Sequence, residues 1–143
     1  MNSTFESKWW SVQLPAGWNA HEDSDCVTFE AAVPIGALQI SAARKSTGRV
    51  TEPELMDFAK DESASGARIA PATHGEFTGF ATTLTKDGRR WIKHWLCHDD
   101  VVVFVTYNVS PEHDQVELGE VRRMLDSLKY RRSTNERKLH WRH

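Results

Sequence analysis

A chain of 143 residues, 39% apolar and 27% charged, has the composition of an ordinary globular protein and the length of one domain. Its longest apolar runs fall well short of the roughly 20 residues that a membrane-spanning helix needs, so no membrane partner is expected. Met1–Ser7 shows no basic segment followed by an apolar core, which argues against a signal peptide. A cytoplasmic location is therefore predicted.

The net charge of −2 is unevenly distributed along the chain. Residues from Lys129 onwards include six Lys or Arg and one acid, a net +5, so residues 1–128 carry −7. An acidic body is not typical of a nucleic-acid-binding domain, which presents a basic face. We therefore predict no nucleic-acid partner, a single domain over residues 1–131, and a basic tail over residues 132–143 for which disorder is expected.

The first half of the chain alternates between apolar and polar residues in short segments that end at turn residues. The expected strands are Lys8–Leu14, Trp18–Glu22, Cys26–Glu30 and Gly36–Ala43, with a weaker candidate near Ala67–Ala70. Between them, Thr51 and Glu54 have the spacing of a capping box around Pro53. This pattern predicts a helix over Glu52–Glu62.

The second half of the chain contains the longest strand-like segments. They are Glu76–Lys86, Arg89–His98 and Val101–Val109. The first two are joined by Asp87-Gly88, which is among the strongest short-range hairpin signals. Ser110 and Pro111 then begin a second predicted helix, Glu112–Lys129, whose apolar stripe is Val116, Val121, Met124, Leu125 and Leu128.

Because most sequential strands are joined by tight turns, the predicted fold class is α+β: a mainly antiparallel, twisted β-sheet of six to eight strands packed with two α-helices. The apolar positions of these elements define the expected core. It comprises Trp10, Val12, Leu14, Val27, Phe29, Leu38, Ile40, Phe58, Val103, Val105, Val121, Leu125 and Leu128.

Few residues have the arrangement that catalysis or metal binding requires. Cys26 and Cys97 lie in strand-like runs without CxxC spacing and are expected to be buried free thiols. On one strand, His94 and His98 share a face but lie about 13 Å apart, and Cys97 points the other way. We predict no metal and no cofactor, and we keep as an alternative a small cysteine-dependent enzyme that uses Cys97 or His94.

The strand Arg89–His98 has two chemically different faces. Arg89, Trp91, Lys93 and Trp95 share one face, and Ile92, His94 and Leu96 share the other. We predict a binding site on the face turned away from the last helix. Trp91 and Trp95 are its expected anchors, and Arg89 and Lys93 form its rim. If both tryptophans are core residues, the site belongs on the opposite face instead.

Three segments carry a family resemblance: the turn Leu14-Pro15-Ala16-Gly17-Trp18, the strand Gly36–Ser41, and a closing helix that ends near Ser127-Leu128. Over residues 5–131 the order of elements resembles the PsbP-like superfamily, which includes the photosystem II accessory protein, a Ran-binding nuclear import factor and uncharacterised bacterial families. The resemblance implies a non-enzymatic adaptor, here of a bacterial branch, that has a protein or peptide partner and is often a homodimer. Some bacterial relatives are chaperones of type VI secretion effectors, so that role is the alternative function.

Overall fold

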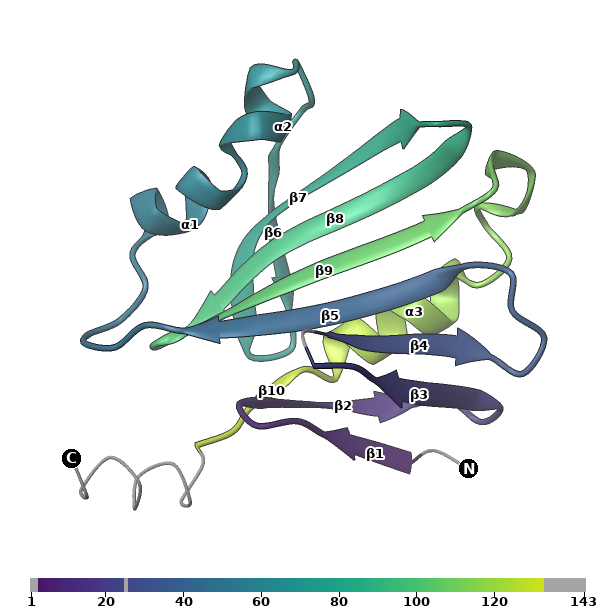
Figure 1. Ribbon diagram of the computed structural model, residues 1–143, viewed down its shortest axis with the longest axis horizontal. Coiled ribbons are helices and arrows are strands. Elements are labelled where there is room, and N and C mark those ends of the chain that lie inside the picture. Colours follow the sequence, from purple (N-terminus) through teal and green to yellow (C-terminus); the bar gives the residue numbers. More distant parts are fainter. Residues whose placement is uncertain (1–2, 25, 133–143) are drawn as a thin grey trace.

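A seven-stranded antiparallel sheet forms the centre of the protein in the computed structural model, which describes residues 3–24 and 26–132 (Figure 1). The strand order is β3-β4-β5-β9-β8-β7-β6. The strands are β3 (Trp18–Glu22), β4 (Val27–Ala31), β5 (Ala37–Arg44), β6 (Ala70–His74), β7 (Phe77–Lys86), β8 (Arg89–His98) and β9 (Val101–Val109). The predicted α+β class is confirmed. Most of the predicted tail, residues 133–143, lies outside the described residues.

A second sheet of three strands, in the order β1-β2-β10, packs beside the first (Figure 1). It contains β1 (Ser3–Glu6), β2 (Trp10–Leu14) and β10 (Lys129–Tyr130). Neither β1 nor β10 was predicted, because each is short and has little apolar alternation of its own. Both pair with β2, whose buried residues Trp10, Val12 and Leu14 join the main core.

The helices are shorter than predicted. They are α1 (Glu52–Phe58), α2 (Lys60–Ala64), the 3₁₀ turn η1 (Pro111–His113) and α3 (Leu118–Asp126). The first predicted helix is divided at Ala59, whose φ of −97° and ψ of 5° are not helical. The second begins six residues later than expected, because Pro111 starts only a 3₁₀ turn. It ends at Asp126, since Lys129 and Tyr130 pair with β2 instead.

Helix α3 covers one face of the large sheet. Its residues Val121, Met124 and Leu125 are buried in the main cluster with the inward residues of β5 and β9. Every residue of the predicted core is buried except Phe58, which is 50% exposed. Val116, predicted to belong to the helix stripe, is 59% exposed because it precedes α3. The prediction that Cys26 and Cys97 are buried free thiols is also only partly met, since both are free but only half-buried.

A buried carboxylate fastens the start of α3 to the sheet. Glu117, which precedes the helix, accepts hydrogen bonds at Oε1 from the Tyr107 hydroxyl (2.8 Å) and the Gly36 amide (3.0 Å). Burial, with the hydrogen bond to Glu117, raises the pKa of Tyr107 and keeps its hydroxyl protonated as a donor. A side chain at Gly36 would enter this site, because its Cβ would lie 2.6 Å from the Tyr107 hydroxyl oxygen.

Gly36→Ala is therefore expected to lower the free energy of unfolding by about 1–3 kcal/mol, the usual cost of overpacking. The matched change, Gly119→Ala, places a methyl group in open space on α3 and should leave stability unchanged or raise it by up to about 1 kcal/mol. Urea unfolding of both variants measures the difference. Equal effects would show that contact with Tyr107 does not require glycine at position 36.

Candidate functional site

The predicted binding residues lie on the face of the large sheet opposite α3. Cross-strand pairing places Trp91, Lys93 and Trp95 of β8 directly opposite Asn108, Thr106 and Phe104 of β9, respectively. Helices α1 and α2 cover only part of this face, at the side of the molecule away from the three-stranded sheet (Figure 1). Beside these helices lies an exposed region that we call the open face; it is formed by Phe58 at the end of α1 and by Trp91, Phe104, Thr106 and Asn108 of the sheet.

The two predicted anchors have different surroundings. Trp95 is 6% exposed and belongs to a second core beneath α1, with Leu55, Ala59 and Val102. Trp91 is half-buried, and its indole N–H is buried with no hydrogen-bond partner among the described residues. Trp95 is thus a packing residue in this structure, whereas part of Trp91 reaches the open face.

Both predicted rim cations are engaged within the protein. Lys93 Nζ lies 2.8 Å from Glu62 Oε1 of α2 and 5.9 Å from the centroid of the Trp91 ring. The hydrogen bond from Lys93 lowers the pKa of Glu62. Arg89 Nε donates to the side-chain oxygen of Asn108 at 2.8 Å. Because both cations already have partners, a bound protein would compete with these interactions to reach either of them.

An aromatic pair at the edge of α1 was not predicted from the sequence. Phe58 of α1 meets Phe104 of β9 edge to face, with ring centroids 5.0 Å apart. Beside them lies a hollow of about 320 Å³ between α1, β5 and β9, whose walls include Val50, Phe58 and Val102. One signal was available: Phe104 is an aromatic residue at a position of β9 that alternation directs away from the α3 core.

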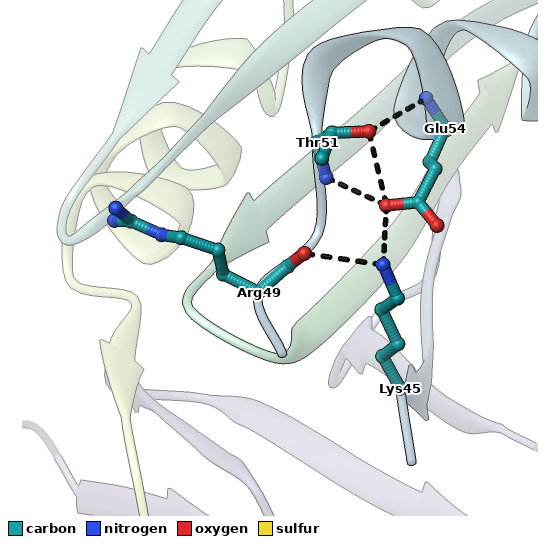
Figure 2. A network of polar contacts seen from close by, with 4 residues as sticks. All are labelled: Lys45, Arg49, Thr51 and Glu54. Atoms are coloured by element: carbon teal, nitrogen blue, oxygen red, sulfur yellow. Dashed lines mark hydrogen bonds and ion pairs between the residues drawn. The ribbon is translucent and has the colours of Figure 1, made fainter. Parts of the chain in front are cut away.

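A network of hydrogen bonds connects the loop before α1 to the first turn of that helix (Figure 2). Glu54 Oε1 accepts hydrogen bonds from Lys45 Nζ (2.8 Å), the Thr51 amide (2.9 Å) and the Thr51 hydroxyl (3.0 Å). The Glu54 amide donates back to Thr51 Oγ1, which completes the predicted capping box. Lys45 also donates to the backbone oxygen of Arg49 at 3.3 Å. The ion pair with Lys45 and the bonds from Thr51 lower the pKa of Glu54 to about 2.

Thr51→Ala should remove the cap and destabilise the protein by about 1 kcal/mol, the usual cost of losing such an N-cap. Thr47→Ala, an exposed threonine in the preceding loop, is the control and should change stability by less than about 0.5 kcal/mol. Chemical denaturation at neutral pH measures both. If the two variants were equally stable, the network in Figure 2 would not determine where α1 begins.

Cys97 and the nearby histidines, which a cysteine-dependent enzyme would use, are not arranged as a nucleophile and a general base. Cys97 is half-buried beneath α1, and burial raises the pKa of its thiol. His98 Nδ1 lies 2.7 Å from the backbone oxygen of Glu76, and His94 lies on the opposite face. Over the described part of the chain, no hydrogen bond joins Cys97 to an imidazole, and no three His, Cys, Asp or Glu side chains are grouped to hold a metal ion.

No protein-family model and no curated protein sequence matches the chain. Solved structures resemble it. A crystal structure from Bacteroides thetaiotaomicron aligns with a TM-score of 0.64 and 17% identity over 90% of this chain and 48% of that one, so the chain spans about half of that protein. The solution structure of cyanobacterial PsbP (CyanoP) from Synechocystis aligns with a TM-score of 0.60 and 10% identity over 91% and 92% of the two chains. The chain has the PsbP-like fold.

A third solved structure shares this fold. The crystal structure of LpqN, involved in cell envelope biogenesis of Mycobacterium tuberculosis, aligns with a TM-score of 0.57 and 13% identity over 90% of this chain and 84% of that one. At these identities the likeness establishes the fold, and function has to be argued from the site. None of the helices in the described part of the chain has the length and apolar character of a membrane-spanning helix.

Proposed function

We propose that this PsbP-like domain is a non-enzymatic module that binds a protein or peptide on its open face. The observation that carries the proposal is the exposure of Phe58, which is 50% accessible although it sits against Phe104 beside a hollow. Aromatic side chains dominate binding hot spots, where they gain most when a partner removes them from water. Trp91 is half-buried on the same face of the sheet, about 13 Å along the strands from Phe104, and offers a second aromatic side chain to a partner.

The chemistry around the hollow suggests what the partner presents. Its lining combines apolar side chains with charges of both signs, Arg44, Lys45, Glu54 and Asp57, and of these Lys45 and Glu54 already form an ion pair. An apolar side chain of the partner would enter the hollow, and flanking polar groups would bind at the margin. This is the usual organisation of a protein interface, in which an apolar centre is surrounded by a polar rim.

The state of Cys97 supports a binding role over a cysteine-dependent enzyme. Nucleophilic cysteines have a lowered pKa, whereas burial raises the pKa of Cys97. Alkylation of the folded protein at neutral pH distinguishes the two roles. We expect both cysteines to react more slowly than a free thiol; rapid, stoichiometric labelling of Cys97 would favour the enzyme.

Site-specific photo-cross-linking tests the proposal. A photoreactive amino acid is placed at Phe58 or, as the matched control, at Val116, which is also an exposed apolar residue. In cell extract, a specific protein should cross-link at position 58 and not at position 116. Phe58→Ala should then weaken binding of that protein at least about tenfold while lowering the free energy of unfolding by less than about 1 kcal/mol.

Equal cross-linking at the two positions would contradict a site on the open face. A product containing two copies of this chain would instead identify the partner as a second protomer, which sedimentation of the purified protein would verify. The cytoplasmic location predicted from the sequence is part of the same proposal, and fractionation of cells that express the full chain tests it.

A further inference from the structure

A second cavity lies on the other face of the sheet, between α3 and strands β6–β9. Its volume is about 360 Å³, within the range of small-molecule sites. The walls are mainly apolar, with Ile92, Val105, Val121 and Leu125 facing one another across the space. Ala72 and Ala81 contribute small side chains where larger ones would fill it.

One end of the cavity contains two imidazoles from different strands. His94 of β8 is 7% exposed, and its Nδ1 has no hydrogen-bond partner among the described residues. The ring of His74, from β6, meets it edge on, with centroids 4.8 Å apart, and His74 Nδ1 lies 2.8 Å from Asp126 Oδ1 of α3. A buried polar atom without a partner is costly, so a group that satisfied His94 would be bound favourably.

The end of the cavity opposite His94 carries Arg90 of β8, and Arg122 of α3 also lines the cavity. Asp114 is the one carboxylate among the described lining residues, and its Oδ2 lies 3.7 Å from Arg90 Nε. Arg122 is exposed, and the described residues give it no ion pair. Arg90 and His94 are four residues apart on one strand, so about 13 Å separates the two ends.

We propose that this cavity binds a small monocarboxylate with an apolar body and a polar group at its far end. The carboxylate pairs with Arg122 and Arg90, the planar donor groups that suit a carboxylate. The body of the ligand lies against Ile92, Val105, Val121 and Leu125. The far polar group hydrogen-bonds the imidazole of His94. This site is separate from the open face and does not depend on the function proposed there.

The test is a titration of the full chain with 3-(4-hydroxyphenyl)propionate, followed by calorimetry and by NMR of the imidazole ring protons. Saturable binding with a dissociation constant below about 1 mM is expected, with shifts at His94 and His74. The uncharged amide of the same acid should bind at least about tenfold more weakly, because it cannot pair with a guanidinium. The acid without its phenolic hydroxyl should also bind more weakly, since it leaves His94 unpaired.

Two variants place the ligand. Arg122→Gln should weaken binding about tenfold, whereas Arg123→Gln, its exposed neighbour on α3, should stay within about twofold of the parent. Ala81→Leu fills the cavity and should abolish binding, and its melting temperature shows whether the variant is folded. If it is not folded, the comparison of Arg122→Gln with Arg123→Gln tests whether the ligand occupies the cavity. The proposal is overturned if neither acid moves the NMR signals of the imidazole ring protons at up to about 10 mM. It is also overturned if the amide binds as tightly as the acid, or if Arg122→Gln and Arg123→Gln have the same affinity for the acid.

Discussion

Trp95→Ala should lower the free energy of unfolding by about 3–5 kcal/mol, the range for removing a large buried aromatic side chain. Trp95 lies between the sheet and α1, with Leu55 and Ala59 above it and Val102 beside it. Removing the indole leaves a cavity that α1 cannot fill without losing its other contacts. Trp91→Ala should cost less than about half as much, because the Trp91 side chain is half-buried and lies beyond the second core.

Urea unfolding followed by circular dichroism measures both variants, and Phe58→Ala is a useful third, since its exposure predicts a cost below about 1 kcal/mol. The comparison matters for function, because a tryptophan can be tested as an anchor only if the protein remains folded without it. Trp91→Ala is therefore the variant to use in binding experiments. A result in which Trp91→Ala was the more destabilising would show that α1 does not depend on Trp95.

The second large effect is a loss of stability in mild acid that depends on His94. Burial, with a smaller contribution from the neighbouring His74, lowers the pKa of His94 from 6.5 to about 4. The unfolded chain therefore takes up a proton as the pH falls through 6.5, whereas the folded protein does not until about pH 4. Between these values the unfolded state binds more protons, so stability falls as the pH is lowered. The full effect is about 3 kcal/mol, because one pKa unit corresponds to about 1.4 kcal/mol.

His94→Gln should flatten stability between pH 6.5 and about pH 4.5, measured as the urea midpoint at several pH values. His21→Gln, which replaces an exposed histidine, is the matched control. The lowered pKa of Glu54 acts in a different window: its contribution is present above pH 4.5 and is lost as the pH falls towards about 2. An unchanged slope in His94→Gln would mean that His94 is protonated in the folded protein at higher pH than its burial indicates.

The features that the sequence determined by itself are those built from neighbouring residues. Asp87-Gly88 predicted a hairpin, and both residues have positive φ, 54° and 74°, as its tight turn requires. The Thr51–Glu54 spacing predicted a capping box, and both of its hydrogen bonds are present. Alternation along β8 and β9 assigned their side chains to opposite faces. Turns, caps and alternation depend on local backbone geometry, so a single sequence is enough to recognise them.

The candidate site was predicted only in part for a related reason. Alternation predicted that Arg89, Trp91, Lys93 and Trp95 share one face of their strand, and the register of β8 with β9 agrees. It carried no information on which of them α1 would cover, because that depends on how a helix packs from a separate part of the chain. Phe58 was expected in the core on its helical spacing, but Leu55 and Ala59 take the inward positions and leave it half-exposed.

Only the tertiary structure decided the remaining features, because each depends on residues distant in the sequence. Strand β10 has two residues and becomes a strand only because β2 provides its partner. Glu117 is an ordinary acid in the sequence, yet it is buried where Tyr107 and Gly36 supply donors. The cavity beneath α3 brings together His74, His94 and Asp126 from β6, β8 and α3. Long-range packing brings these groups together, and the pattern of residues within a single segment does not predict which distant residues will come into contact.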